Sequence, residues 1–465
     1  MISPCIFWKT HGRATEAHSS VGKPNMDLKS LSQDLFAASK QGTLPEVERL
    51  ISLKANVNVR DTSSDDKHHF TPLLISAKNG HLEVLKRLYE AKADINSKDN
   101  DRRGPVLYWA ASEGRLAVVQ WLVQEARVDV ETFNKNKSTP VYIAAYEGHL
   151  PVVRWLVKEG GARVNAANVD GTSPVHVAAH HGHLSIVKWL ITEGKAPVDA
   201  EEVDGCTPLH SAACGHLSVA KWLVSEGKAR VDATRKDGCT PLYFAAHTGG
   251  LPMVKFLVTE GRADVQHSTE SGDVALHIAA HKGHLSLVRW LATEGKARAD
   301  ATRKDGLSAL HFAAERNHLP VVRWLIDHGK APADCANEKQ VTPLFIAACH
   351  GHLPVVEALV EGKAALDKAD KKGDTPLIIA AWFGQLPVVK YLAEAKASLA
   401  TAGPDGTAFE AALKRGRNEV ATWLNGLAHT RATRTLERDL QILHMLEPLI
   451  MDALFEDHRV AMDPS

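Results

Sequence analysis

Apolar residues recur along most of this chain in pairs of short helical patterns. The segment that begins at Ser173 is a clear example, because its apolar positions fall three and four residues apart, the spacing of one face of a helix. A first stripe consists of Val175, Ala178 and Ala179. A second stripe consists of Leu184, Val187, Leu190 and Ile191. The pattern therefore predicts two short amphipathic helices within residues 173–191.

The residues around these stripes predict where each helix begins and ends. Ser173 and Pro174 suit a helix start, because a hydroxyl caps free backbone amides and proline lacks only a hydrogen that the first turn does not use. Gly182 suits the end of the first helix, because the left-handed turn found there needs no side chain, and Gly194 is expected to stop the second helix. Residues 196–205 contain several charged residues and end in Asp-Gly, which favours an extended loop with a tight turn. The predicted unit is helix, turn, helix and projecting hairpin.

This unit recurs with a nearly fixed period. Clear copies of a Thr-Pro-Leu-His-x-Ala-Ala string, followed by Gly-His-Leu, begin at Thr71, Thr139, Ser173, Thr207, Thr240, Thr342 and Thr375. Weaker copies begin at Gln33, Pro105, Val274, Ser308 and Thr407. Successive starts lie 32 to 38 residues apart, and 34 on average. A period of this length indicates a stacked array, in which each unit packs only on its neighbours.

The repeated string resembles the ankyrin repeat position by position over residues 28–426. The resemblance implies an all-α solenoid of about twelve helix-turn-helix units with projecting β-hairpin loops. In two respects the chain departs from the family. The end of the second helix, as in TEGKAPVD, carries one extra residue, and a tryptophan replaces the usual aliphatic residue in many second helices. We expect these tryptophans to pack between repeats: Trp121, Trp155, Trp189, Trp222, Trp290, Trp324 and Trp423.

The chain is thereby divided into three predicted parts. Residues 1–27 are expected to be a disordered tail, within which Met26 is an alternative translation start. Residues 28–426 form the predicted array. Residues 427–465 are predicted to contain a C-terminal amphipathic helix and a short tail. The unit at Thr207 has one residue fewer before its Gly-His-Leu, so its first helix should be short or its turn distorted.

Composition narrows the choice of partner and compartment. The 55 basic and 55 acidic residues cancel, which argues against nucleic acid as the main partner. Six cysteines without Cys-x-x-Cys spacing are expected to be free thiols in a reducing compartment. The chain has no run of 18 apolar residues that would span a membrane, and its first residues make a poor secretory signal. A cytoplasmic location is expected, with the nucleus not excluded.

The 25 histidines raise the question of catalysis or metal binding. Eleven of them occupy the repeated Thr-Pro-Leu-His and Gly-His-Leu positions, where a structural role is expected. The sequence contains no His-Glu-x-x-His motif, no phosphate-binding glycine loop and no Gly-x-Ser-x-Gly motif. We therefore expect no enzyme activity, no cofactor and no metal.

Two positions that follow the paired alanines of the first helix face the concave groove in ankyrin arrays, so the resemblance implies that they contact a partner. Adjacent aromatic residues at such positions, Trp382 and Phe383, are typical of a binding hot spot. The alternatives are a solvated groove without function and metal binding by the histidines. The candidate partner-binding residues are Tyr146, His180, His181, His247, His281, Arg316, His350, Trp382 and Phe383.

The C-terminal segment has a helical apolar stripe interrupted near Pro448. The stripe consists of Leu436, Leu440, Leu443, Leu446, Ile450 and Leu454. This segment either caps the last repeat, which otherwise exposes core, or recruits a partner or a second copy. The expected function is a protein-protein interaction scaffold without catalysis, acting through the concave groove and hairpin tips. The alternative is a substrate-recruiting or regulatory subunit of a ligase, kinase or phosphatase complex, docking through the C-terminal helix. Partner identity and oligomeric state stay open.

Overall fold

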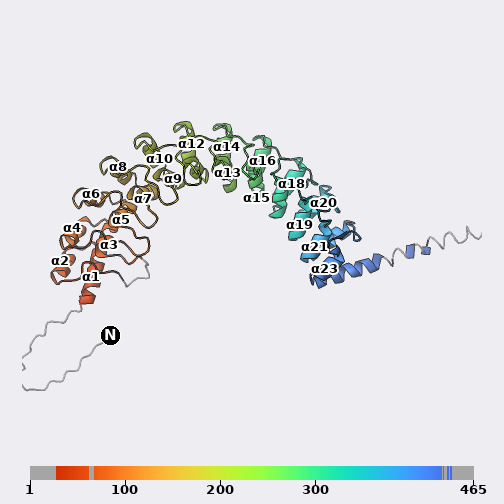
Figure 1. Ribbon diagram of the computed structural model, residues 1–465, viewed down its shortest axis with the longest axis horizontal. Coiled ribbons are helices and arrows are strands. Elements are labelled where there is room, and N and C mark those ends of the chain that lie inside the picture. The colour runs from red at the N-terminus through yellow and green to blue at the C-terminus, as the bar shows by residue number, and fades with distance from the viewer. Residues whose placement is uncertain (1–27, 62–67, 432, 434–436, 439, 442–465) are drawn as a thin grey trace, which may run out of the picture. The chain divides into compact units, whose positions relative to one another are not determined.

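The computed structural model describes residues 28–61, 68–431, 433, 437–438 and 440–441, and it divides the chain into two units, 1–163 and 164–465. Both described units are built from antiparallel helix pairs stacked in chain order (Figure 1). The predicted all-α solenoid is confirmed. The predicted disordered tail, residues 1–27, lies outside the described residues.

The first unit contains α1 (Leu28–Gln41), α2 (Leu44–Ser52), α3 (Pro72–Asn79), α4 (Leu82–Glu90), α5 (Val106–Ser112), α6 (Leu116–Gln124), α7 (Pro140–Glu147) and α8 (Leu150–Lys158). The second unit begins with α9 (Pro174–His180), α10 (Leu184–Thr192), α11 (Pro208–Ala213), α12 (Leu217–Ser225), α13 (Pro241–Thr248), α14 (Leu251–Thr259), α15 (Ala275–His281) and α16 (Leu285–Thr293). It continues with α17 (Ala309–Glu315), α18 (Leu319–Asp327), α19 (Pro343–His350), α20 (Leu353–Glu361), α21 (Pro376–Phe383), α22 (Leu386–Glu394) and α23 (Ala408–Lys414). Helical residues 418–431 follow α23.

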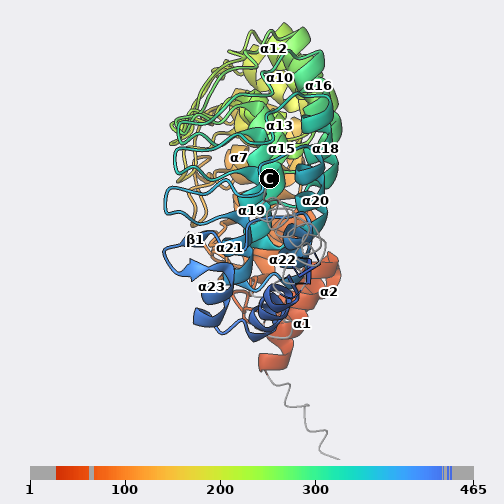
Figure 2. The same ribbon diagram turned by 90° about the vertical axis from the view of Figure 1, so that its right-hand side faces the viewer.

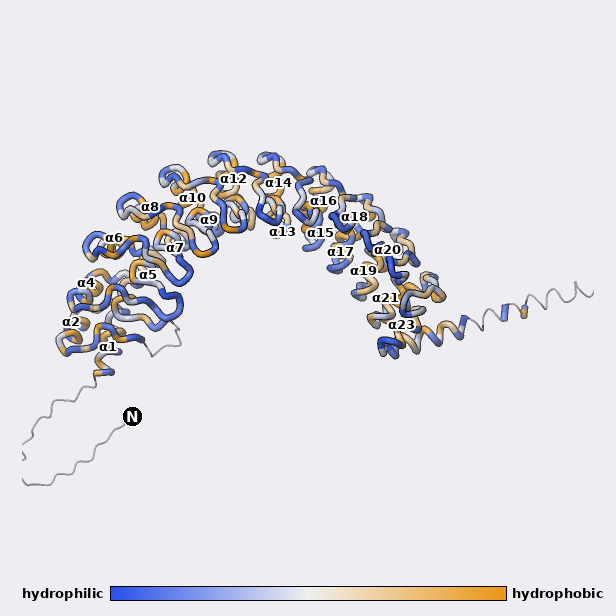
Figure 3. Tube along the Cα trace, viewed as in Figure 1, coloured by the Kyte–Doolittle hydropathy of each residue, from blue (hydrophilic) through white to orange (hydrophobic). Residues whose placement is uncertain are grey.

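The first helices after α1 begin as the sequence predicted, whereas α1 begins at Leu28, five residues before the predicted start at Gln33. The Thr375 hydroxyl accepts a hydrogen bond from the Ile378 amide at 3.3 Å, and Pro376 occupies the first turn of α21. Gly384 ends α21 in the left-handed conformation, with φ of 80°. Along the Cα trace, hydrophobic residues are concentrated in the helices, while hydrophilic stretches follow the loops (Figure 3). Paired alanines such as Ala380 and Ala381 are fully buried, which lets neighbouring first helices approach closely.

The extra residue at the end of the second helix is a glycine placed before a left-handed lysine. In α10 the C-cap is Glu193, followed by Gly194 and then by Lys195 with φ of 62°. A Cβ on Gly194 would lie 2.7 Å from the Leu190 carbonyl oxygen, so this position excludes a side chain. The Lys195 ammonium returns to donate to the Thr192 carbonyl at 2.7 Å, which also favours the negative end of the helix dipole.

The projecting loops form hairpin-shaped turns, but strands are rare among the described residues. Strands β1 (Ala402–Gly403) and β2 (Gly406–Thr407) pair antiparallel. Elsewhere the tips are closed by turn bonds, as when the Arg235 amide donates to the Cys239 carbonyl at 3.0 Å and the Gly238 amide donates to the Arg235 carbonyl at 2.9 Å. Neighbouring tips are also linked, since the Lys236 amide donates to the Asp204 carbonyl at 2.9 Å. In the second unit these loops, including β1, lie along one edge, and α16, α18 and α20 lie along the opposite edge (Figure 2). The prediction of projecting loops holds, although most contain no strand.

Two irregularities follow from the sequence. Helix α11 spans six residues, shorter than the seven or eight of its neighbours, which confirms the predicted effect of the missing residue. At the C-terminal end, the helix of residues 418–431 runs through Gly426 without a break. Leu440, one member of the predicted apolar stripe, is 54% exposed. Whether this segment caps the last repeat or recruits a partner stays a prediction. The other members, at 436, 443, 446, 450 and 454, lie outside the described residues.

Candidate functional site

Buried histidines in the Thr-Pro-Leu-His string hold the hairpin of the next repeat. His210 lies with its Nε2 3.1 Å from the Cys239 carbonyl oxygen, and because a carbonyl can only accept, Nε2 must carry the hydrogen and donate. Its Nδ1 then accepts from the Thr207 amide at 3.1 Å, which closes the start of α11. Burial is the main reason that the pKa of His210 falls to about 4. The same arrangement recurs at His176, His277 and His311.

The histidine of the Gly-His-Leu turn links its repeat to the preceding one. The Nε2 of His284 donates to the His247 carbonyl at 3.1 Å. Its ring fills the space beside Gly249, where a Cβ would lie 2.6 Å from the imidazole. Equivalent bonds are made by His81, His149, His318 and His352. The structural role expected for these histidines is confirmed. Because the imidazole of one repeat lies against the turn glycine of the preceding repeat, this role also explains why glycine and histidine recur together along the chain.

The candidate partner-binding residues differ in how much of them is accessible. Phe383 is 45% exposed and Tyr146 is 39% exposed. His281 and Trp382 are half-buried, and the other five are exposed, namely His180, His181, His247, Arg316 and His350. Tyr146 belongs to the first unit, and the others belong to the second. Their contact with a partner stays a prediction.

Trp382 is less exposed than the sequence predicted, because an arginine of the next repeat lies over its ring. The Arg415 guanidinium lies 3.7 Å from the centroid of its ring, a cation–π contact between the last two repeats. The Arg417 Nε also donates to the Trp382 carbonyl at 3.3 Å. Trp382 therefore contributes to packing as well as to the surface, while Phe383 is the more accessible of the two aromatics. The sequence gave no sign of this stacking, because the contact spans one full repeat.

Two further pairs of candidates are brought together. The Arg316 Nε donates to the His281 Nε2 at 2.9 Å, so this imidazole accepts and is uncharged in that arrangement. Burial, followed by the nearby Arg316 charge, lowers the pKa of His281. The rings of His180 and His181 lie 5.1 Å apart, and burial together with neighbouring imidazoles lowers the pKa of His181. His247 and His350 belong to other repeats than these pairs. The His350 Nδ1 lies 3.0 Å from the Ile346 carbonyl oxygen of its own helix.

The described residues offer little chemistry beyond binding. Among them, no three histidine, cysteine, aspartate or glutamate side chains converge in a way that could hold a metal ion. The five described cysteines are free thiols, and burial raises the pKa of Cys206 and Cys239 to about 12, which disfavours the nucleophilic thiolate. No helix in the described part of the chain has the length and apolar character needed to cross a bilayer.

A recurring arginine in the hairpins is a feature that sequence reasoning left unexplained. Arg235 lies 2.8 Å from Asp204 of the preceding hairpin and 3.6 Å from Asp237 of its own. Its guanidinium also lies 5.4 Å from the centroid of the Phe244 ring. Arg303 repeats this arrangement in a nearly identical hairpin. Residues 231–239 and 299–307 are similar in sequence, and in both the arginine contacts two aspartates and one phenylalanine ring.

Comparison with known families agrees with the geometry. A model described as ankyrin repeats (3 copies) matches residues 161–235, 227–305, 286–370 and 310–402. A model described as ankyrin repeats (many copies) matches residues 74–123 and 107–157. These ranges cover more than half of the chain and include no catalytic domain. No curated protein matches the chain. Repeats of this kind typically mediate protein-protein interactions.

Proposed function

Since the chain belongs to the ankyrin-repeat family, we propose that it is a protein-protein interaction scaffold without catalysis, which binds its partner through the groove-facing ends of the first helices and the hairpin tips. The observation that carries this proposal is the exposed Phe383 beside the Arg415-covered Trp382. An exposed aromatic on a rigid helix loses little conformational freedom when it is buried, which favours its use as a binding anchor. Free described cysteines support the further proposal of a cytoplasmic location.

Comparison of the repeats supports this choice of surface. The positions after the paired alanines change from His180-His181 to Glu315-Arg316 and then to Trp382-Phe383. The buried and turn positions of the same helices hardly change. A scaffold needs constant residues where repeats pack, whereas recognition needs different side chains along the surface.

The test compares two single variants by affinity capture and by melting temperature. Phe383→Ala should leave the melting temperature unchanged, because nearly half of its side chain is exposed, and should weaken partner recovery roughly tenfold, the effect of losing about 1.4 kcal/mol. Leu28→Ala is the control, since Leu28 is 62% exposed but lies at the start of α1. Equal recovery of every partner by both variants would contradict the proposed groove.

A second candidate function rests on the C-terminal helix. Residues 418–431 remain helical past Gly426, and Leu440 further along the chain is exposed, so the C-terminal segment offers an apolar residue that the array does not cover. In this form the protein is a substrate-recruiting or regulatory subunit that docks on a ligase, kinase or phosphatase complex. Leu440→Asp should then abolish co-purification of such a complex while Phe383→Ala preserves it.

A further inference from the structure

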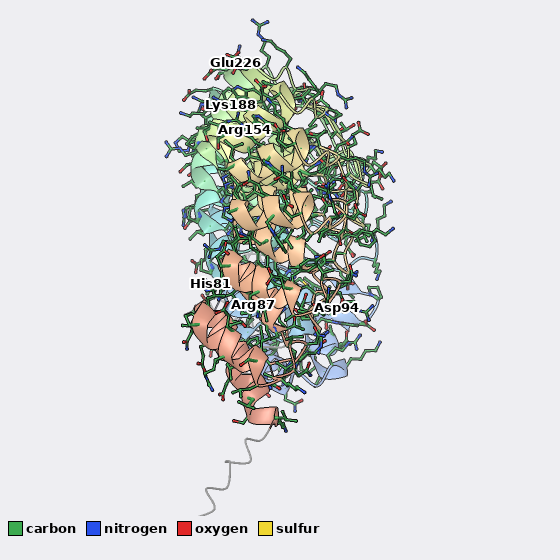
Figure 4. The ribbon with its side chains drawn as sticks, turned by 90° about the vertical axis from the view of Figure 1, so that its left-hand side faces the viewer. His81, Arg87, Asp94, Arg154, Lys188 and Glu226 are labelled. Atoms are coloured by element: carbon green, nitrogen blue, oxygen red, sulfur yellow. The ribbon has the colours of Figure 1, made fainter. Side chains whose placement is uncertain are left out.

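The second helices of the unit formed by residues 164–465 carry a basic residue at one fixed position. Each of these residues precedes the aromatic position of its helix and is exposed. They are Lys188, Lys221, Lys255, Arg289 and Arg323, in α10, α12, α14, α16 and α18. Figure 4 shows Lys188 on the same edge of the molecule as Glu226, the residue that directly follows the next second helix, α12. At α20 the row is interrupted, because the equivalent residue is Glu357, and α22 again carries an exposed basic residue, Lys390.

The basic side chains lie over aromatic rings of the following repeat. The Lys221 ammonium is 5.6 Å from the centroid of the Phe256 ring, and the Lys255 ammonium is 5.8 Å from that of Trp290. Between α14, α16 and α18 lies a surface hollow of about 470 Å³. Its lining includes Lys255, Arg289, Trp290, Glu294, Trp324 and His328. The surface therefore combines cations with the edges of indole rings.

Most of the positive charge of this row is not neutralised within the described chain. No described carboxylate lies within 4.0 Å of Lys188, Lys221, Lys255 or Arg289. Arg323 differs, since it pairs with Glu361 at 2.9 Å. The Glu294 carboxylate of the hollow is engaged by the Trp290 indole N–H at 2.9 Å. Four consecutive second helices thus present a cation that is available to carboxylates of another molecule.

The spacing and the intervening charges identify the kind of partner. Closely packed helices lie about 8–10 Å apart, and the second helices of this row, which lie on the outer side of the stack, are less closely packed than the first helices (Figure 1). Seven residues of an α-helix span about 10.5 Å, which is the nearest match on one face of a partner helix. Glutamates at the C-terminal ends of the same helices, such as Glu226 and Glu260, are exposed five residues after the cations. A uniform polyanion such as nucleic acid would meet these carboxylates and be repelled. A helix with widely spaced carboxylates would pair with the cations and avoid the glutamates.

We infer that this basic row is a second docking surface, which binds a helix of a partner protein that carries a carboxylate at every seventh residue. Four such carboxylates require about 22 helical residues. The chain's own residues 442–465 fit this pattern poorly, because only Glu456 and Asp463 among their acidic residues are seven apart. The charge complementarity therefore favours a different protein over the chain's own C-terminal segment.

The test uses two fluorescent 28-residue helical peptides of identical composition, rich in alanine and glutamine, with four glutamates placed either seven or five residues apart. Binding to the full chain is measured by fluorescence anisotropy at low and at physiological salt. The seven-residue peptide should bind at least tenfold more tightly than the five-residue peptide. The variant K255E/R289E should weaken its binding at least tenfold, because attraction becomes repulsion at two adjacent positions.

The matched control is K236E/K304E, which makes the same change in net charge at two exposed hairpin lysines and should alter affinity less than twofold. Equal binding of both peptides, or unchanged binding to K255E/R289E, overturns the inference. So does stronger competition by a DNA duplex than by the peptide, or a tenfold gain in affinity on removal of residues 442–465. Phe383→Ala should leave peptide binding unchanged, which separates this surface from the groove.

Discussion

The two rows of helices in the unit formed by residues 164–465 differ in how strictly they repeat. The second helices keep a valine or other aliphatic residue, a basic residue and an aromatic residue in nearly the same order from α10 to α18. The exposed ends of the first helices change from His180 to Arg316 to Phe383. Positions that pack against the next repeat are bound by the same geometry each time, whereas exposed ends are free to vary. Residues that recur in every repeat therefore hold the array together, and residues that vary between repeats are the candidates for partner recognition.

The largest expected effect lies in the constant row. Trp290 is 5% exposed beneath Lys255, so Trp290→Ala should leave a cavity and lower the free energy of unfolding by about 3–5 kcal/mol. Denaturant unfolding monitored by circular dichroism measures this change. A loss below about 1 kcal/mol would show that the aromatic position is not part of the packing and would break the comparison.

Acidification should act on the constant first-helix histidines. Burial holds the pKa of His210 and His311 at about 4, below the unfolded value near 6.5, so the unfolded chain binds more protons. The stability that each neutral histidine contributes is present above pH 6.5 and is lost as pH falls toward 4. Between pH 7 and pH 5 the loss is about 2 kcal/mol per histidine.

Thermal unfolding at pH 7, 6 and 5 measures this dependence. The variant His311→Gln, which cannot titrate, should show a smaller loss than the wild type over the same range. An identical pH dependence of the two proteins would contradict the titration of His311.

Adjacent glycines offer a sharper comparison within one turn. Gly249 has φ of 78° and a Cβ there would lie 2.6 Å from the His284 ring, so Gly249→Ala should cost about 1–2 kcal/mol or more. Gly250 has φ of −71° and its nearest neighbour would lie 3.5 Å away, so Gly250→Ala should be neutral or stabilise by up to about 1 kcal/mol. Melting temperatures of both variants decide the matter, and the prediction fails if the two changes have equal effects.

The smallest effect on stability is expected at the variable row. Phe383→Ala should change the free energy of unfolding by less than about 0.5 kcal/mol, as is usual at exposed sites. Trp382→Ala should cost more, because it removes the contact with Arg415. Denaturation midpoints of the two single variants, measured side by side, test this order. A larger loss for Phe383→Ala would mean that the ring packs against the array.

The periodic sequence predicted much of this detail. Thr375 and Pro376 at the start of α21, and Gly384 at its end, act through local backbone chemistry, which the sequence displays directly. The short α11 followed from one missing residue. The extra residue of the second-helix ends was visible in TEGKAPVD, although the left-handed lysine was not. A sequence pattern does not separate a left-handed glycine from a glycine that is required because a carbonyl lies close by.

By itself, the sequence determined the repeat, its helices, its turns and the role of the buried histidines, because each depends on contacts within a unit or on contacts that recur identically in every unit. Tertiary structure decided which of two adjacent aromatics is exposed, since Arg415 reaches Trp382 from the next repeat. It also decided that Arg235 joins two hairpins and that cations line the second helices. Those outcomes depend on how neighbouring repeats are offset in space, and a one-dimensional period does not record that offset.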